Sequence, residues 1–259
     1  MKVLVIGDIV GRTGRRLVER LLPELKTRYH PELIIANGEN AAGGAGITPT
    51  LAEELFDYGV HIITSGNHIW DKKEIVPYIS REPRLIRPEN YPPGTPGRGW
   101  ALIKVSGGIP IAVANFSGRV FMRDLDCPFQ GVDKLLPLLQ EKTKVILVDF
   151  HAEATAEKQA FGWYLDGRVT AVFGTHTHVQ TADERILKSG TAYITDIGMT
   201  GPAEGVIGVE KDRALQRFIT QMPQRFRPAK GPGVLNGIVI DIDEVTGLGR
   251  RIERIIEYG

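Results

Sequence analysis

Cysteine is almost absent from this sequence. Cys127 is the only cysteine among 259 residues, so the chain cannot form an internal disulfide. Any metal ion would therefore be bound by histidine, aspartate, glutamate or asparagine. We expect Cys127 itself to be a small filler or a chance surface residue, because free cysteine usually behaves as a small apolar side chain.

Long apolar runs are also missing. No segment approaches the roughly 20 apolar residues that a membrane-spanning helix needs. The apolar run at the N-terminus is too short for the core of a signal peptide, since it ends at Asp8. We therefore predict a cytoplasmic protein with no membrane partner.

An excess of one charge is the third absence. The formal net charge is +1, and the charged fraction of 24% and the hydrophobic fraction of 42% are ordinary for a globular protein. This balance excludes the strongly basic surface of a protein that coats nucleic acid. A small nucleotide or an RNA end stays open as a substrate, because such a ligand needs only local positive charge.

The first part of the chain alternates short β-branched runs with amphipathic stretches of helix length, which is typical of an α/β fold. The leucines between positions 17 and 25 share one helix face. Thr48 and Pro49 are residue types that begin a helix. The predicted strands are Val3–Ile6, Leu33–Ala36 and His61–Thr64, and the predicted helices are Gly14–Tyr29 and Pro49–Tyr58.

The later part of the chain is richer in strands. Glycines at 107 and 108 and the turn Glu244–Gly247 predict two hairpins. Pro88–Gly99 is predicted to be a surface loop. The other predicted elements are the strands Trp100–Val105, Ile109–Asn115, Lys144–Phe150, Val169–Phe173, Leu235–Ile242 and Arg250–Glu257, and the helix Ala154–Tyr164. We predict a single domain over residues 1–259, with mixed sheets packed face to face and helices outside.

Polar residues gather where the predicted strands end. In open α/β sheets, ligands bind outside the carboxyl ends of the strands, so we expect these clusters to converge in space. The clusters are Asp8, Asn37–Asn40, Gly66–His68, His151 and Gly174–His178.

The residue types in these clusters point to transition metals. Carboxylate, imidazole and amide groups form a mixed nitrogen and oxygen set that suits manganese, iron, cobalt or zinc better than calcium. There are more candidate ligands than one ion uses, and Glu39 could bridge two ions at ~3.5–4 Å, as in two-metal hydrolases. His176 and His178 are two residues apart, so in extended backbone their rings would point the same way.

Other polar and glycine-rich features have simpler interpretations. His30, near a predicted helix end, and His61, inside a predicted strand, are interpreted as structural residues. The glycine-rich run 41–46 lacks the Gly-Lys-Ser/Thr ending of a phosphate-binding loop, and the early glycines do not match the dinucleotide-binding motif. We interpret the run as a rim of the site and do not favour a dinucleotide-binding oxidoreductase.

In order and type, these motifs resemble those of the calcineurin-like metallophosphoesterases. The resemblance spans residues 7–178, and its most specific elements are Asn67-His68 and the pair His176 and His178. The sequence departs from the usual pattern at two points. An apolar residue, Val10, stands where a ligand histidine is usual, and Glu39 replaces the usual aspartate.

A bacterial branch of this superfamily matches better. Gly7–Arg15, Asn37–Asn40 and Gly66–Trp70 together resemble the YmdB-like 2′,3′-cyclic-nucleotide phosphodiesterases, and that resemblance extends over nearly the whole chain. It implies a four-layer α/β/β/α sandwich with two metal ions, commonly iron or manganese.

The resemblance also implies a role for each site residue. Asn40 would replace the missing histidine through its side-chain oxygen, Glu39 would bridge the ions, and His68 would protonate the leaving oxygen. The implied ligands are Asp8, Glu39, Asn40 and His178 for the first ion, and Glu39, Asn67, His151 and His176 for the second.

The resulting hypothesis is hydrolysis of a 2′,3′-cyclic nucleotide or another phosphodiester by a hydroxide that bridges the two ions, with His68 as general acid. In a simpler alternative, His68 only orients Asn67. A phosphomonoesterase is a second alternative. The rival from another class is a regulatory RNA-binding protein with a secondary metal site, for which Arg225, Arg227 and Lys230 form a small basic cluster. The native metal, the physiological substrate and association into a homo-oligomer stay open.

Overall fold

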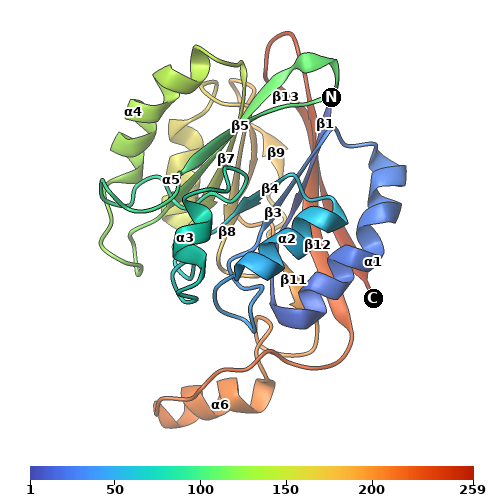
Figure 1. Ribbon diagram of the computed structural model, residues 1–259, viewed down its shortest axis with the longest axis vertical. Coiled ribbons are helices and arrows are strands. Elements are labelled where there is room, and N and C mark those ends of the chain that lie inside the picture. Colours follow the sequence, from blue (N-terminus) through green and yellow to red (C-terminus); the bar gives the residue numbers. More distant parts are fainter.

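Two mixed β-sheets lie face to face, and helices cover the outer face of each sheet (Figure 1). The computed structural model describes residues 1–259. One hydrophobic cluster fills the space between the sheets, and two further clusters lie between each sheet and its helices. This layering confirms the predicted four-layer α/β/β/α sandwich.

The first sheet contains the two ends of the chain. Its strands are β1 (Lys2–Ile6), β2 (Asp8–Ile9), β3 (Leu33–Asn37), β4 (Ile62–Thr64), β11 (Met199–Pro202), β12 (Gly233–Ile242) and β13 (Gly249–Tyr258). The order is β2-β11-β12-β1-β3-β4, with β13 paired to β12. The strands β1, β3 and β4 are parallel, whereas β12 and β13 form the predicted antiparallel hairpin.

The second sheet comes from the middle of the chain. Its strands are β5 (Trp100–Lys104), β6 (Pro110–Ser117), β7 (Val145–His151), β8 (Ala171–Thr175), β9 (Arg185–Ile186) and β10 (Ala192–Ile194), in the order β5-β6-β7-β8-β10-β9. The strands β6, β7, β8 and β10 are parallel. The antiparallel pair β5 and β6 confirms the other predicted hairpin, with a short 3-10 turn at Ser106–Gly108.

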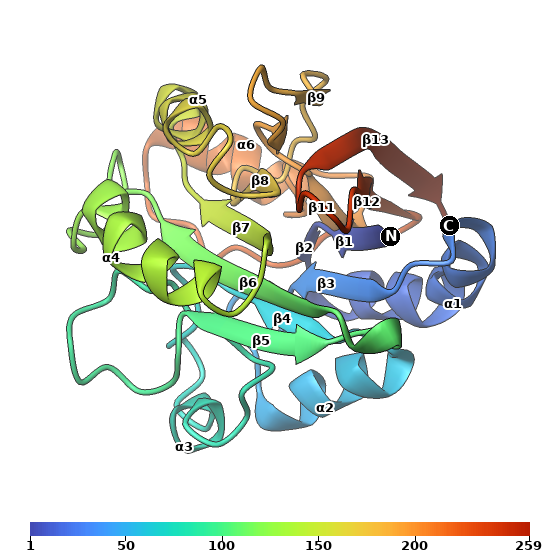
Figure 2. The ribbon, with the colours of Figure 1, turned by 90° about the horizontal axis from the view of Figure 1, so that it is seen from above.

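The helices α1 to α5 divide between the two outer faces (Figure 2), and α6 lies apart from them. Their bounds are α1 (Gly11–Tyr29), α2 (Pro49–Tyr58), α3 (Ile75–Ile79), α4 (Pro128–Gln140), α5 (Thr155–Tyr164) and α6 (Lys211–Thr220). Apolar residues of α1, α2 and α3 pack on the first sheet, and those of α4 and α5 pack on the second. None of the helices combines the length and the apolar character that crossing a membrane requires.

Helix α2 begins and ends as its sequence predicts. The Thr48 hydroxyl accepts a hydrogen bond from the Leu51 N–H at 3.3 Å, and Pro49 occupies the first turn. The helix ends at Gly59, whose φ of 104° is a left-handed conformation that a residue without Cβ adopts freely.

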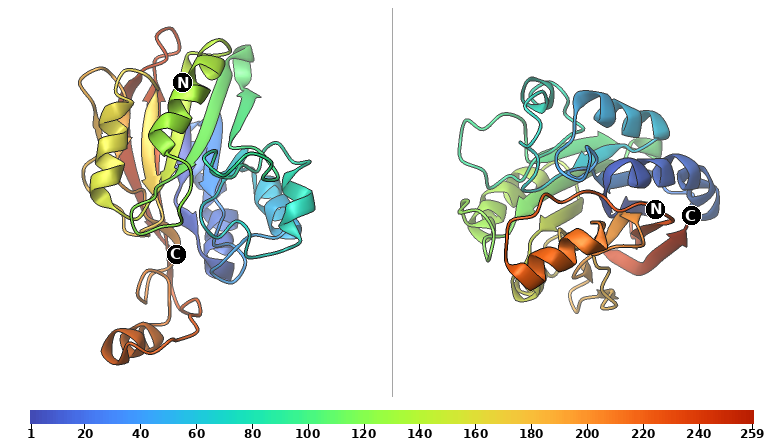
Figure 3. Two further views of the ribbon diagram at one scale, coloured as in Figure 1. Left: turned by 90° about the vertical axis from the view of Figure 1, so that its left-hand side faces the viewer. Right: turned by 90° about the horizontal axis from the view of Figure 1, so that it is seen from below.

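The start of α1 and the presence of three further helices differ from the sequence prediction. Helix α1 begins at Gly11, three residues before the predicted start, where the Gly11 N–H donates to the Asn40 carbonyl at 2.9 Å. Helices α3, α4 and α6 were not predicted from the sequence. Helix α6 projects away from the two sheets (Figure 3), and Ala214 is its only buried residue.

The irregular segment Pro88–Gly99 is a loop, as predicted, and Arg87 holds it together. The buried Arg87 guanidinium donates to the carbonyls of Pro88, Thr95 and Pro96 at 2.8, 3.2 and 3.1 Å. A single side chain therefore satisfies backbone acceptors from both halves of the loop.

A buried ion pair supports the segment that carries His176 and His178. Lys158 on α5 donates to the Asp196 carboxylate at 2.6 Å, and both side chains are almost fully buried. The same Asp196 oxygen accepts from the Thr177 hydroxyl at 2.7 Å and from the Thr177 N–H at 3.3 Å. The segment between the two histidines is thus fixed to the body of the second sheet.

Replacing Lys158 with methionine tests this support. The Lys158→Met change leaves the Asp196 carboxylate buried without its cation, which costs about 3–5 kcal/mol of unfolding free energy. Urea unfolding measures the loss. The control is Lys188→Met at an exposed position, where a change within about 0.5 kcal/mol is expected. Equal losses in the two variants would contradict a structural role for the ion pair.

Candidate metal centre

The predicted site residues all lie at one edge of the two sheets, beyond the carboxyl ends of parallel strands. Asp8 follows β1 across Gly7, His151 ends β7, and the other residues stand in the turns after β3, β4 and β8. The expected convergence is therefore confirmed. The residues that meet there are Asp8, Glu39, Asn40, Asn67, His68, His151, His176 and His178.

His151 is the centre of the first group of side chains. Its Nε2 atom lies 2.9 Å from Asn67 Oδ1, 3.0 Å from Glu39 Oε1 and 3.0 Å from His176 Nδ1. Potential ligand atoms of Glu39, His151 and His176 all lie within 4.8 Å of one another. One metal ion could contact all of these atoms after small shifts of the side chains.

Hydrogen bonds behind His151 determine which ring nitrogen faces the site. The Thr175 hydroxyl donates to Asp149 Oδ1 at 2.7 Å, so it can only accept from His151 Nδ1, which lies 2.9 Å away. This leaves Nε2 without a proton in the neutral ring, as a metal ligand requires.

Glu39 is almost completely buried, yet it stays ionised. Burial alone would raise the pKa of Glu39, but His151 and the backbone N–H of His68 lower it to about 2. That N–H donates to Glu39 Oε2 at 3.0 Å. The two carboxylate oxygens therefore face different neighbours, as a bridging ligand would need.

Three buried carboxylates favour a positive charge on the His151 ring. Burial by itself lowers the pKa of the His151 ring, whereas Glu39, Asp8 and Asp149 raise it to about 9. His176 responds in the opposite way, because burial and the adjacent His151 lower its pKa to about 3. The group as a whole thus attracts one concentrated positive charge, which a metal cation provides.

A second group of side chains surrounds Asp8. His178 Nδ1 donates to the Ile207 carbonyl at 2.9 Å, so Nε2 is the ring nitrogen that faces Asp8 Oδ1, at 3.8 Å. Asn40 donates through its amide nitrogen to the Gly44 carbonyl at 3.0 Å. Its oxygen is therefore left free for another partner.

Two buried oxygens in this second group have no hydrogen-bond partner, namely Asp8 Oδ1 and Asn40 Oδ1. Leaving such atoms unsatisfied is costly. Burial also raises the pKa of Asp8 to about 6, even though His178 and His151 lower it. A cation between Asp8, Asn40 and His178 would satisfy both oxygens, so these residues fit a metal ion.

The extended backbone expected for His176 and His178 is wrong. Their φ angles are 96° and 66°, both in the left-handed region. The two rings consequently point to different partners, since His176 contacts His151 and His178 faces Asp8. His176 therefore belongs to the group around His151, and His178 belongs to the group around Asp8.

His68 stands apart from these groups at the surface of the site. Its Nδ1 atom lies 2.7 Å from Asp71 Oδ2, and 37% of its side chain is exposed. His61 and His30 are structural, as interpreted from the sequence. His61 Nδ1 accepts from the Ile34 N–H at 2.9 Å, and His30 ends helix α1.

Several supporting residues were missed at the level of sequence. Glu153 contacts His176 Nε2 at 3.1 Å, and Asp71 contacts His68. Asp149 stands two residues before His151 on one strand face, a spacing that could have revealed it. Gly66 is also required, because a Cβ there would lie 2.2 Å from the His151 ring.

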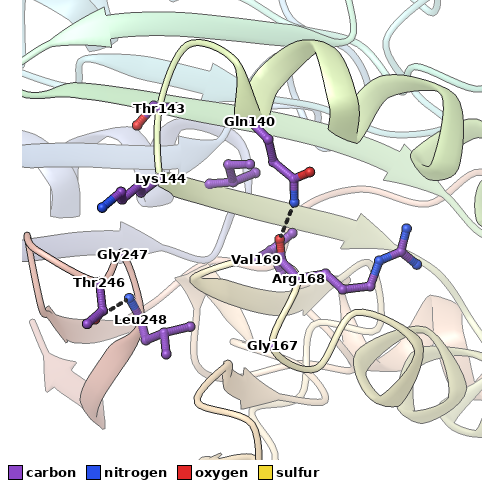
Figure 4. A pocket seen from close by; sticks show the side chains of 10 residues that line it. Gln140, Thr143, Lys144, Gly167, Arg168, Val169, Thr246, Gly247 and Leu248 are labelled. Carbon is purple, nitrogen blue, oxygen red and sulfur yellow. Dashed lines mark hydrogen bonds between the residues drawn. The ribbon is translucent and has the colours of Figure 1, made fainter.

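Other cavities are separate from these groups. One cavity of about 190 Å³ lies beside Lys144 and Val169, which precede β7 and β8, at the opposite edge of the second sheet (Figure 4). A larger one of about 580 Å³ lies between α4 and the loop after Arg87. Neither is lined by any of the predicted metal ligands.

The sequence and the fold are similar to those of known proteins. A 2′,3′-cyclic-nucleotide 2′-phosphodiesterase of Bacillus subtilis is 52% identical over 256 residues, which are 99% of this chain and 97% of the relative. A crystal structure of a hypothetical protein from Thermus thermophilus superposes with a TM-score of 0.93 at 43% identity, covering 100% of this chain and 99% of the other. A crystal structure of a phosphatase from Mycoplasma pneumoniae gives 0.94 at 34% identity, covering 100% and 93%.

The family model described as YmdB-like protein matches residues 4–255, nearly the full length. Together with the relatives and the shared fold, this match means that the chain belongs to the YmdB-like protein family.

Proposed function

We propose that this protein is a metal-dependent phosphodiesterase that hydrolyses 2′,3′-cyclic nucleotides. The observation that carries the metal requirement is the pair of unsatisfied buried oxygens on Asp8 and Asn40, beside His178. The cyclic-nucleotide substrate is supported by the name of the Bacillus subtilis relative, which is 52% identical to this chain.

Two ions, of iron or manganese, are proposed to bind to the two groups of side chains. Asp8, Asn40 and His178 would hold one ion, Asn67, His151 and His176 would hold the other, and Glu39 would contact both. Bound ions lower the pKa of water and neutralise the charge that develops on the phosphate oxygens. The nitrogen and oxygen donors suit either metal.

The residues of the chain would then orient the substrate and move protons. His68 has one ring nitrogen on Asp71, which leaves Nε2 free to donate a proton to the leaving ribose oxygen. Asp71 fixes the orientation of the ring. The backbone N–H of His68 donates to Glu39. His68, the proposed general acid, therefore also positions Glu39, the proposed bridging ligand.

Metal content and hydrolysis together test the proposal. We expect about two transition-metal ions per chain by elemental analysis, and turnover of 2′,3′-cyclic AMP and bis-p-nitrophenyl phosphate. A chelator is expected to lower the melting temperature, because a ligand that binds only the folded state stabilises it. The Glu39→Gln variant keeps the side-chain volume, and we expect it to lose turnover and bound metal.

An absence of both metal and turnover, even after reconstitution with manganese or iron, would contradict the proposal. Release of phosphate from p-nitrophenyl phosphate at a higher rate than diester hydrolysis would favour the phosphomonoesterase alternative instead.

A separate prediction concerns His68. We expect His68→Ala to reduce turnover of 2′,3′-cyclic AMP by ~10²–10⁴-fold, the range typical of general acid catalysis, with the metal content unchanged. The loss is expected to be much smaller for bis-p-nitrophenyl phosphate, since p-nitrophenolate leaves without a proton. The control is His30→Ala, at the end of α1. Equal losses for the two substrates would mean that His68 only orients Asn67.

The RNA-binding alternative depends on different residues. Arg225, Arg227 and Lys230 are exposed in the segment after α6. An RNA-binding function would be lost when these residues are replaced and would survive Glu39→Gln, which is the reverse of the result expected for the enzyme.

The cytoplasmic location and association into a homo-oligomer stay predictions. Helix α6 offers a surface for association with a second copy of the chain, because Phe218 and Ile219 are 68% and 79% exposed. Sedimentation equilibrium of the chain and of a Phe218→Glu variant would test this part.

A further inference from the structure

The loop after β6 begins beside the candidate metal centre. Ser117, the last residue of β6, pairs with His151, and the Gly118 N–H donates to the His151 carbonyl at 2.9 Å. Phe121 follows Gly118 by three residues, and three residues of extended chain span at most about 11 Å. The backbone of Phe121 therefore stays close to His151.

A carboxylate of α5 fixes the path of this loop. Glu157 accepts from the Arg119 N–H at 3.0 Å and from the Val120 N–H at 3.2 Å. Two successive backbone donors on one side chain hold the segment just before Phe121. The loop is therefore ordered by the body of the protein rather than by the contacts of Phe121 itself.

Phe121 is held in an unusual conformation. Its ring is 90% exposed, the highest value among the large apolar side chains of the chain, and its φ is 61°. Left-handed backbone is rare for a bulky residue. An exposed apolar ring on strained backbone does not contribute to the stability of the fold. Backbone strain of this kind concentrates at functional sites.

Aromatic and amide groups connect the loop with His68. Trp70, two residues after His68, packs edge to face on Tyr91 with 5.8 Å between ring centres. Asn90, the neighbour of Tyr91, donates through its amide nitrogen to the carbonyls of Ser117 and Asp126, at 2.9 Å in each case. These two residues stand at the two ends of the loop, so the loop is joined to the segment on which Trp70 packs.

We propose that Phe121 is a specificity residue that stacks on the base of a nucleotide substrate whose phosphate lies at the metal centre. This inference rests on the proposed function and deepens it, because it says how the enzyme would recognise the nucleoside part. A flat, exposed aromatic ring suits a base, since every base has a face that can stack.

Stacking also predicts which substrates are preferred. A ring face discriminates by the size of the stacked surface rather than by hydrogen bonds, so purine 2′,3′-cyclic nucleotides are expected to bind better than pyrimidine ones. All four bases are expected to be accepted.

The test compares two substrates that differ only in the base. These are 2′,3′-cyclic AMP and methyl riboside 2′,3′-cyclic phosphate, in which a methoxy group replaces adenine. The readout is the ratio of their kcat/KM values in wild type, in Phe121→Ala and in Phe121→Trp. We expect Phe121→Ala to lower the ratio about tenfold, within the range of one base-aromatic stack, mainly through KM. Phe121→Trp is expected to keep it.

Val245→Ala is the control, because Val245 is 77% exposed and its carbonyl accepts from Lys144, at the edge of the second sheet opposite the candidate metal centre. It is expected to leave the ratio unchanged. A thermal melt of each variant checks that the fold is intact.

Several outcomes would overturn the inference. If Phe121→Ala changed both substrates equally, or neither, the ring would not contact the base. If wild type hydrolysed bis-p-nitrophenyl phosphate but showed no preference for 2′,3′-cyclic AMP over the base-free substrate, the base site would be wrong and the phosphodiesterase would stand. If wild type hydrolysed none of these diesters, the proposed function itself would be wrong.

Discussion

Buried negative charge at the edge shared by the two sheets is the constraint on which the rest of the site depends. Asp8, Glu39 and Asp149 are almost fully buried, and an unpaired buried carboxylate costs several kcal/mol. His151 compensates Glu39 by direct contact and lies close enough to influence the other two. Because Asp8 belongs to the first sheet and His151 to the second, this buried charge lies where the two sheets meet.

The left-handed backbone of His176 and His178 is the second cost of building this edge. Each non-glycine residue in that region costs roughly 1–3 kcal/mol and persists only where its surroundings hold it. Thr177 lies between them and is held by Asp196, whose charge is in turn compensated by Lys158. The buried ion pair thus stabilises a conformation in which neighbouring histidines face different groups of ligands.

The sequence predicted what depends on local pattern, and it did not predict what depends on distant contacts. The Thr48 cap, the two hairpins and the strands that end at candidate ligands follow from residue type and spacing. The handedness at His176 could not be predicted, because it depends on Asp196, twenty residues further along the chain. Likewise, β11 pairs with β2 and β12 through non-local hydrogen bonds that leave no periodic signal. Asp149 lies inside an otherwise apolar strand and is two residues before His151, so its position on the same strand face was a local signal that the prediction did not use.

The direction of each hydrogen bond separates the ligand candidates from the structural histidine. In the neutral ring, His151 and His178 each donate through Nδ1, to Thr175 and to the Ile207 carbonyl, which leaves Nε2 to face a carboxylate. His176 is reversed, with Nε2 on Glu153 and Nδ1 toward His151. His61 instead accepts with its Nδ1 from the backbone N–H of Ile34 in β3. Since a metal ligand needs one nitrogen on an acceptor and the other without a proton, three rings at this edge meet the requirement and His61 does not.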